Sequence, residues 1–427
     1  MKELYIITNN SKAGQYGIGT YITQLLYCLQ TCIKIQVTVI MLDSQKDELV
    51  EKHIEGVRYL LLPTIQIHAL EKDYRRYARS VAYVLASYIA PNRELIFHFN
   101  YSYHIWLAEA LKNRFPRCRT ILTLHYLPWC FDLSGNIHRF RAILSQEEKE
   151  RDILERQIYE EYLNDKRFYN EVDKVICLCG ETQSFLYEIY NVPIEKIELI
   201  YNGLSDEQTA LSNKDKKEIK AELGFTESEK IILFVGRVNQ LKGIHWLIEA
   251  FKKTLSKYPE ARLIIIGDGN ISDYLGLCNG IWGKVIFTGK LRKDQLYRFY
   301  QIADIGVLPS CQEQCSYVGI EMLMHGIPLV GTDAMGISEM IEEGYKIPLK
   351  IGGEEISLCT DKLSDSILSA LANKGFFGKR ARHRFEKYYS LNTMRLKVTQ
   401  LYNSECVNTQ YIVKLLIINF KCDEKTS

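Results

Sequence analysis

The order of apolar segments is the feature that most restricts the fold of this chain. Short apolar runs of strand length alternate with longer segments whose apolar residues recur at helical spacing. In the first half, strands are predicted at 4–8, 37–41, 59–62, 95–99, 120–124, 175–179 and 198–201. The pattern then restarts, with strands predicted at 230–235, 262–266, 285–288, 305–309 and 329–331. Such alternation predicts an α/β fold of doubly wound, mostly parallel sheets.

Helices are predicted between these strands, and a polar run separates the two halves. The predicted helices are 20–29, 75–89, 145–168, 244–258, 293–303 and 317–325, followed by one or two basic helices in 375–403. The turn dipeptide Asn202-Gly203 precedes the polar run 205–220, which we interpret as the interdomain link. The division into residues 1–203 and 204–391 agrees with a length of 427 residues, because a domain has about 100–200 residues.

Composition indicates an ordinary globular protein. Hydrophobic residues make up 47% of the chain, and the net charge of +2 does not suggest a nucleic-acid partner. The twelve cysteines include no C-x2-C pair, so no structural zinc site is expected. The N-terminus is predicted to be a strand rather than a signal, and no apolar run approaches the ~20 residues of a membrane span. We therefore expect a cytoplasmic protein with reduced thiols. The apolar segment 411–420 is expected to pack on the body, with a weak membrane contact as the alternative.

Two cations follow the strand predicted at 230–235. Gly236-Arg237 and Lys242-Gly243 lie in the loop after this strand. Ligands of open α/β sheets bind at the carboxyl ends of strands, and Arg and Lys are the side chains that bind phosphate. Two solvated surface cations would be the expectation for any single Arg and Lys, but the neighbouring motifs favour a diphosphate site.

Two carboxylates flank the next strand-to-helix junction. Glu313 and Glu321 have seven residues between them, and Ser316 is predicted to cap the N-terminus of the helix 317–325. A helix N-terminus presents N–H groups to anions, whereas carboxylates accept hydrogen bonds from sugar hydroxyls. Alternatively, Glu313 caps the helix and Glu321 is a surface residue. Because Glu321 lies in a largely apolar stretch, we expect it to have a specific partner.

Two features of the first half are weaker. Gly17, in the segment Tyr16–Thr20, opens a helix after the first strand, where glycine lets the backbone approach a phosphate. The segment is not a complete G-x-G-x-x-G fingerprint, so a plain tight turn is an equal alternative and a dinucleotide-dependent oxidoreductase is disfavoured. His125 follows the strand predicted at 120–124, where it could face a cleft or be structural.

Taken in order, these motifs resemble those of the nucleotide-sugar glycosyltransferases with the GT-B fold, specifically the retaining family-4 type. The resemblance is strongest from 231 to 341, through the series GRVNQLKG, IIGDG, FTGKL, ADIGVLPS, EQCSYVGIE and HGIPLVGTDAMGISEMI. It extends more loosely through YGIGTYI, TLHYLP and IYNGLS. The resemblance implies two Rossmann-like domains that face a cleft, with residues 392–427 crossing back to the first domain.

The resemblance also implies roles for individual residues. Arg237 and Lys242 would bind the donor diphosphate, Glu321 the ribose hydroxyls, and the Gly17 backbone the phosphates. Catalytic roles near the transferred sugar are implied for Glu313 and His125. Ser316 stands where the family has a glycine after the first carboxylate, and Met335 stands where a second glycine is common in the later loop. Both departures lie in the phosphate loops and are expected to affect backbone geometry there rather than the fold.

The expected reaction moves a hexose from a nucleotide-diphosphate sugar to a hydroxyl of a glycan, lipid-linked or other acceptor, with retention and without a metal. Polysaccharide or glycoconjugate synthesis is the favoured context, and peripheral contact with the inner face of the membrane stays open through Arg75-Arg76 and the segment 114–119. The alternatives are a non-catalytic nucleotide-sugar or glycan-binding protein on the same scaffold, a different GT-B enzyme such as a sugar-phosphate synthase or an epimerase, and a transferase that modifies a peptide or natural product. The donor sugar and the choice between UDP and GDP stay open.

Overall fold

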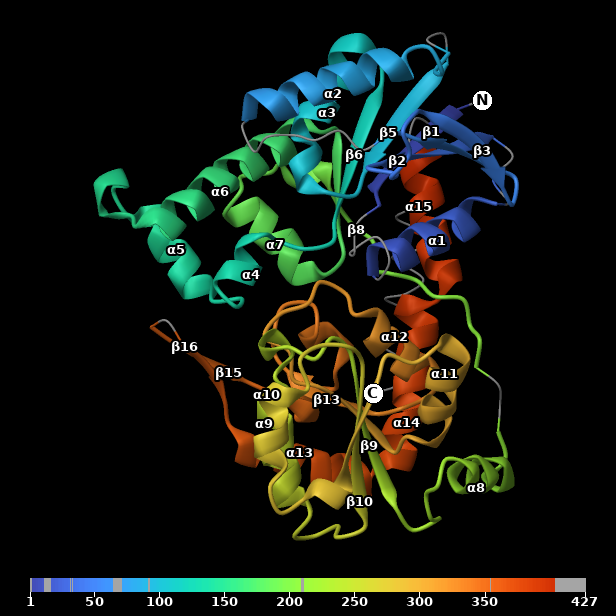
Figure 1. The fold of residues 1–427 in the computed structure, drawn as a ribbon, viewed down its shortest axis with the longest axis vertical. Helices are drawn as coiled ribbons and strands as arrows, with labels where there is room; N and C mark the ends of the chain where they lie inside the picture. Colours follow the sequence, from blue (N-terminus) through green and yellow to red (C-terminus); the bar gives the residue numbers. More distant parts are fainter. Residues whose placement is uncertain are drawn as a thin grey trace, which may run out of the picture.

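The computed structural model describes residues 2–10, 17–30, 32, 34–63, 71–90, 93–208, 211–353 and 355–403. Two separate parallel sheets, each covered by helices, lie one above the other (Figure 1). The predicted α/β fold with two doubly wound sheets is therefore confirmed. The apolar segment 411–420 lies outside the described residues.

The first sheet contains all seven strands predicted for the first half and one that was missed. Its strands are Lys2–Asn9 (β1), Ile35–Leu42 (β2), Val50–Ile54 (β3), Val57–Leu61 (β4), Glu94–Phe99 (β5), Arg119–Leu124 (β6), Lys174–Cys177 (β7) and Ile197–Leu199 (β8). Their order is β3-β4-β2-β1-β5-β6-β7-β8, and only the β3–β4 pair is antiparallel. The missed strand β3 is an edge strand with mostly exposed side chains, so its sequence carries no apolar alternation.

Helices cover both faces of this sheet. They are Gly17–Leu29 (α1), Glu71–Leu85 (α2), Ile105–Arg114 (α3), Trp129–Asp132 (α4), Ile137–Ser145 (α5), Ile153–Glu171 (α6) and Gly180–Glu188 (α7). The prediction of one helix over 145–168 was wrong, because α6 begins only at Ile153. Asp152 caps it and forms a capping box with Glu155, and this local hydrogen bonding ends the preceding loop.

Successive residues of β1 pack into different cores, as the two-residue period of a strand requires. Leu4 and Ile6 pack in the core that contains α1 and the last helix, Leu391–Asn403 (α15). Tyr5 and Ile7 pack in the core that contains α2, α3 and α6. Because β1 is buried on both faces, its central residues Leu4–Ile7 are all apolar rather than alternating with polar residues.

The second sheet has the order β11-β10-β9-β12-β13-β14 and is entirely parallel. Its strands are Lys230–Val235 (β9), Ala261–Ile266 (β10), Val285–Gly289 (β11), Ile305–Leu308 (β12), Leu329–Thr332 (β13) and Lys346–Ile347 (β14), and a hairpin of Leu349–Gly352 (β15) and Glu355–Leu358 (β16) follows. Its helices are Asn213–Glu222 (α8), Ile244–Thr254 (α9), Ser272–Leu275 (α10), Lys293–Ile302 (α11), Tyr317–Met324 (α12), Thr360–Ala372 (α13) and Lys374–Arg384 (α14). All five strands predicted here are present.

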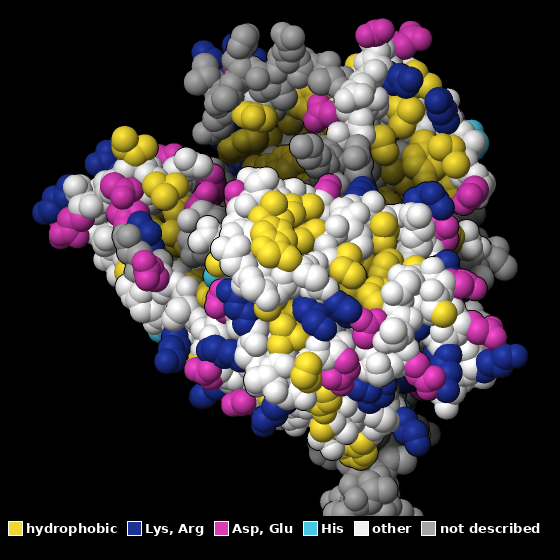
Figure 2. All heavy atoms as spheres, turned by 60° about the horizontal axis from the view of Figure 1, so that its bottom comes forward, with side chains coloured by type: hydrophobic (Ala, Val, Ile, Leu, Met, Phe, Trp, Pro, Cys, Tyr) yellow, Lys and Arg dark blue, Asp and Glu magenta, His cyan; other side chains and the backbone are white. Residues whose placement is uncertain are grey.

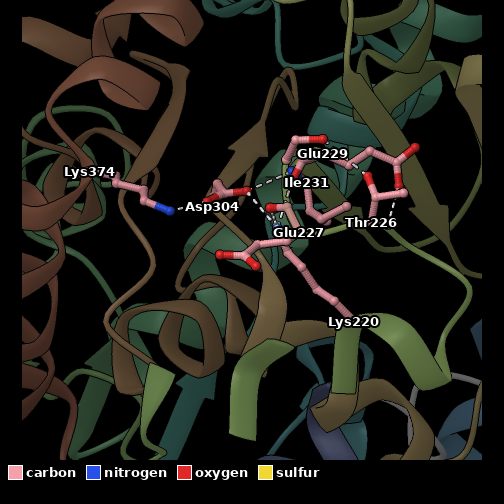
Figure 3. Close-up of polar contacts among 8 residues, drawn as sticks. Lys220, Thr226, Glu227, Glu229, Ile231, Asp304 and Lys374 are labelled. Carbon is pink, nitrogen blue, oxygen red and sulfur yellow. Dashed lines mark hydrogen bonds and ion pairs between the residues drawn. The ribbon is translucent and has the colours of Figure 1, made fainter. Parts of the chain in front are cut away.

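A buried carboxylate ties the amino ends of these strands to two helices (Figure 3). The Asp304 side chain is 3% exposed, and its Oδ2 accepts from the backbone N–H of Ile231 at 2.8 Å. Lys374 of α14 pairs with Asp304, and Lys220 of α8 lies 3.9 Å away. Lys220 also donates to the carbonyl oxygen of Glu229 at 2.6 Å, and burial lowers its pKa. These contacts hold α8 and α14 against the sheet at the end remote from the first domain.

The last helix returns to the first domain, where α15 packs beside α1 (Figure 1). The Tyr402 hydroxyl lies 2.6 Å from Nδ1 of His98, which is fully buried on β5. Nε2 of His98 is bonded to the Thr123 hydroxyl on β6 at 2.7 Å. Burial lowers the pKa of His98 to about 3, so its ring is neutral. A polar contact inside the first domain therefore depends on the end of the last described helix.

Charges of both signs are interspersed on the face that comes forward when the molecule is turned (Figure 2). Small apolar areas separate them, and neither sign dominates this face. Among the helices in the described ranges, none has the length and apolar character that a membrane span requires.

Candidate active site

The candidate residues of the second domain lie in loops and in the start of α12 at the carboxyl edge of its sheet, where parallel strands end together. The loop after β9 carries Arg237 and Lys242, and the segment after β12 carries Glu313, Ser316 and Glu321. Loops of the first domain contact this edge directly, because Asn202, after β8, donates to the carbonyl oxygen of Cys315 at 2.8 Å. The site therefore lies where the two domains meet.

Lys242 and Glu313 form an ion pair with half-buried side chains. The approach depends on Gly243, whose φ is +65° and whose added Cβ would lie 2.1 Å from the carbonyl oxygen of Pro309. The turn that carries Lys242 thus lies directly on the loop after β12, and only glycine fits this contact. Both charged residues are predicted site residues, but their pairing cannot be read from the sequence.

Arg237 stands apart from this pair. Its side chain is exposed, and within the described part of the chain it has no hydrogen-bond or ion-pair partner. The pattern of one paired and one unpaired cation in neighbouring positions gives the loop after β9 a local positive charge, which an anionic group could neutralise.

Ser316 caps α12, as the sequence predicted. Its Oγ accepts from the backbone N–H of Gly319 at 3.3 Å, so the hydroxyl is used within the helix. The amides of Tyr317 and Val318, in the first turn, have no acceptor among the described residues. These groups leave a helix N-terminus able to bind an anion. The departure from glycine at Ser316 is therefore compatible with a phosphate site.

Glu321 has the specific partner that its apolar surroundings predicted. The Tyr300 hydroxyl, from α11, donates to Oε2 of Glu321 at 2.7 Å. Burial raises the pKa of Glu321 to about 7, although this hydrogen bond and the charge of Lys293 act in the opposite direction. Oε1 is left without a hydrogen-bond partner inside the described ranges. Tyr300 was not predicted as a site residue, because the sequence shows it only as one member of the predicted helix 293–303.

His125 lies directly after β6 and is half-buried. Its Nε2 contacts Oδ1 of Asn100 at 3.0 Å, and the Asn100 amide is oriented by donating to the carbonyl oxygen of Ile7 at 3.1 Å. This network assigns the proton of His125 to Nε2 and leaves Nδ1 as an acceptor. The Tyr21 ring packs edge-on against His125, with 4.6 Å between the two ring centroids. Burial lowers the pKa of His125 to about 3. The ring is therefore suited to accept a hydrogen bond from a hydroxyl rather than to act as a cationic acid.

Gly17 is the first residue of α1 and is exposed, with open space around the position of a Cβ. The helix thus begins three residues before the predicted start at Thr20, because the Gly-Ile-Gly segment forms its first turn. A phosphate contact at Gly17 remains a prediction, since the preceding Tyr16 lies outside the described residues.

Solved structures with a similar fold are glycosyltransferases and related enzymes. Sucrose-phosphate synthase from Thermosynechococcus elongatus matches with a TM-score of 0.70 and 19% identity, over 94% of this chain and 98% of that chain. HepE from Anabaena in complex with UDP-glucose matches with a TM-score of 0.66 and 15% identity, over 95% of this chain and all of that chain. At these identities the matches establish the fold alone. Two Rossmann-like domains that meet at strand ends define the GT-B class.

Sequence comparisons place the chain within this class. The family model described as Glycosyl transferases group 1 matches residues 229–373, and the model for Glycosyltransferase Family 4 matches residues 16–208. The chain therefore belongs to the family-4 type of GT-B glycosyltransferases, a family of enzymes. This confirms the resemblance at the level of family and fold.

Curated relatives are matched only over part of their length. An uncharacterized glycosyltransferase of Methanocaldococcus jannaschii is 36% identical over 174 residues, which are 40% of this chain and 44% of the relative. The sulfoquinovosyl transferase of Arabidopsis thaliana is 32% identical over 176 residues, which are 40% of this chain and 33% of the relative. The chain spans between about a third and a half of the length of these relatives.

Proposed function

We propose that the protein transfers a hexose from a nucleotide-diphosphate sugar to an acceptor hydroxyl with retention of anomeric configuration. The observation that carries this proposal is the Lys242–Glu313 ion pair at the domain junction. It joins a cation suited to a diphosphate with a carboxylate suited to sugar hydroxyls. The second domain would bind the donor, and the first domain would bind the acceptor.

Donor binding would exchange partners within this pair. A diphosphate that reaches Lys242 competes with Glu313 for the ammonium group, and Arg237 supplies a second cation. The released Glu313 carboxylate then accepts a hydrogen bond from the transferred sugar, while Oε1 of Glu321 accepts from the ribose. His125, as a neutral acceptor, would hold another sugar hydroxyl from the side of the first domain.

The chemical step needs stabilisation of the leaving group. The acceptor oxygen attacks the anomeric carbon on the face from which the diphosphate departs, as the bond from that carbon to the phosphate oxygen breaks. The acceptor proton passes to the departing diphosphate. Arg237, Lys242 and the N-terminus of α12 would stabilise the charge that develops there. We propose that these fixed groups make a metal unnecessary.

A panel of UDP- and GDP-sugars tests this function, with thermal shift and product formation measured in the presence and absence of EDTA. Stabilisation by one donor, turnover that EDTA does not reduce, and a product of unchanged anomeric configuration by NMR are the expected results. Inversion would refute the retaining mechanism, and loss of turnover with EDTA would refute the metal-free one. Binding without any transfer or hydrolysis would favour the non-catalytic alternative.

The acceptor is proposed to be a glycan or lipid-linked glycan in polysaccharide or glycoconjugate synthesis. The names of the matched relatives differ too much to narrow this further, since they include D-inositol 3-phosphate and lipopolysaccharide transferases. Product formation with lipid-linked and free oligosaccharide acceptors would separate these classes.

Peripheral membrane contact is proposed for α2 only. Arg75 and Arg76 are exposed on this helix, with Arg75 stacked 3.7 Å above the ring centroid of Trp106. The segment 114–119 fits less well, because Arg119 donates to the carbonyl oxygen of Leu401 at 3.2 Å. Co-sedimentation with anionic vesicles at low salt, and its loss in Arg76→Glu, is the expected result. Absence of co-sedimentation would refute the contact.

A further inference from the structure

Two residues of the first domain donate short hydrogen bonds to the loop that carries Glu313, and a third, Cys179, donates a longer one from its thiol to Oε1 of Gln314 at 4.0 Å. The Thr182 hydroxyl, on α7, donates to Oε1 of Gln314 at 2.6 Å. The side-chain amide of Asn202 donates to the carbonyl oxygen of Cys315 at 2.8 Å. Gln314 and Cys315 directly follow Glu313, so the first domain contacts the chain immediately beside the carboxylate.

These contacts are shielded from water. Thr182, Asn202 and Gln314 are 0%, 3% and 4% exposed, respectively. When a buried hydrogen bond loses its donor, the remaining acceptor stays desolvated and unpaired. These two hydrogen bonds therefore stabilise the loop beside Glu313 only while the first domain supplies the donors.

A second loop of the donor domain is held in the same way. Oε1 of Glu339, after β13, accepts from the backbone N–H of Gly180 at 2.6 Å and of Glu181 at 3.2 Å. Its Oε2 accepts from the Tyr201 hydroxyl at 2.7 Å. Gly180 and Glu181 form the N-terminus of α7, where a carboxylate is favoured by the helix dipole. Glu339 thus docks the second domain on the helix that also carries Thr182.

The two loops are joined to each other. The backbone N–H of Glu313 donates to the carbonyl oxygen of Met335 at 3.2 Å. Gly336, with φ of +77°, lies so close that an added Cβ would be 2.2 Å from the carbonyl oxygen of Gln314. A shift of either loop therefore displaces the other, and Glu313 moves with both.

We propose that Thr182, Asn202 and Glu339 are positioning residues that fix Glu313 and the N-terminus of α12 only when the two domains are docked. The inference rests on the proposed function, because it states that the proposed donor site works only when the acceptor domain is docked on it. Within the described ranges, Arg237 and Glu321 make no hydrogen bond or ion pair with Thr182, Asn202 or Glu339, and the Lys242 side chain is connected to this region only through Glu313. Loss of docking should therefore reduce the rate of transfer far more than it weakens donor binding.

The pair Thr182→Val and Thr182→Ser tests this requirement. Valine keeps the shape of threonine and removes the hydroxyl, whereas serine keeps the hydroxyl. We expect Thr182→Val to lower kcat by about 10- to 100-fold, as a misplaced catalytic group does, with donor Kd changed by less than about threefold. The ratio of donor hydrolysis to transfer should rise, because water reaches a loosened site. Thr182→Ser should restore kcat and this ratio to near the wild-type values.

Glu339→Gln provides a second variant in case Thr182→Val does not fold. It keeps the size of the side chain and removes the charge at the N-terminus of α7, and the same split between kcat and Kd is expected. Wild-type kcat and hydrolysis ratio in folded Thr182→Val, or in Glu339→Gln if Thr182→Val does not fold, would overturn the proposal. So would an equal loss in donor binding and in kcat.

Hydrogen exchange separates failure of this inference from failure of the proposed function. Faster exchange of the amides in 313–318 is expected in Thr182→Val and in Glu339→Gln, but not in Thr182→Ser. If the wild-type protein transfers no sugar, the proposed function fails, and exchange alone then decides whether the first domain positions this loop. Unchanged exchange in all variants would overturn the inference whether or not the protein is active.

Discussion

Donor affinity should depend on pH through the ionisation of Glu321. The proposed ribose contact needs the carboxylate, because protonation turns one of its two acceptor oxygens into an O–H donor. Burial raises the pKa of Glu321 to about 7, so lowering the pH removes the binding form. The expected sign is therefore weaker donor binding at lower pH. The phosphates of a nucleotide sugar do not titrate in this range. The intact donor is therefore a better probe of Glu321 ionisation than a free nucleotide.

The size of the effect follows from that pKa. With a value of about 7, roughly one Glu321 in eleven is ionised at pH 6 and roughly ten in eleven at pH 8. Donor Kd should therefore rise about tenfold between pH 8 and pH 6, or about 1.4 kcal/mol. At pH 7 about half a proton should be released on binding, because the bound form is fully ionised.

Isothermal titration of the donor identified in the panel measures both quantities, with proton release obtained from two buffers of different ionisation enthalpy. Glu321→Gln should bind weakly with an affinity that is flat between pH 6 and pH 8. Burial lowers the pKa of His125 to about 3, so its ring does not titrate in this range, and burial also lowers the pKa of His325. Burial also raises the pKa of Asp165 to about 7. Asp165 is retained in Glu321→Gln, so any pH dependence of binding that comes from Asp165 would persist in that variant. A wild-type affinity that is equal at pH 6 and pH 8, or a full pH dependence in Glu321→Gln, would refute the reasoning.

Three further predictions concern charge and close packing. Lys242→Ala should lower kcat at least about 100-fold with an unchanged circular dichroism spectrum, because a cation on the leaving group is lost; wild-type turnover would remove Lys242 from the site. Asp304→Ala should lower the free energy of unfolding in urea by about 3 kcal/mol, since it removes the counter-charge of the largely buried Lys220 and the acceptor of the Ile231 N–H; an unchanged midpoint would contradict this account. Gly336→Ala should reduce both stability and turnover, because its Cβ would meet the carbonyl oxygen of Gln314. Gly344→Ala, with open space at the Cβ, is the matched control and should behave as wild type.

Strands and helix caps that are encoded in consecutive residues could be predicted from the sequence. The strand 230–235 has the same limits in the structure, and the cap at Ser316 follows from one hydroxyl placed before an apolar helix. The missed strand Val50–Ile54 shows the limit of this signal, because an exposed edge strand needs no apolar face.

Contacts between distant residues could not be predicted in this way. Thr182 and Gln314 are separated by 132 positions, and Glu339 and Tyr201 by 138. Each side chain alone is an ordinary member of a helix or loop, and its partner is defined only after both sheets have formed and docked. The apolar surroundings of Glu321 did indicate that a partner exists, but they did not identify Tyr300.

The return of α15 to the first domain bears on how the protein is synthesised. A ribosome releases residues 2–199 long before residues 391–403, yet His98 in β5 bonds to Tyr402, and Lys2 in β1 donates to the Tyr402 carbonyl oxygen at 3.0 Å. Until that helix emerges, the nascent first domain exposes the apolar face against which α15 packs, as well as the unpaired Nδ1 of a buried histidine. The two domains therefore cannot mature strictly one after the other, and the amino-terminal half should be a client for chaperones during translation.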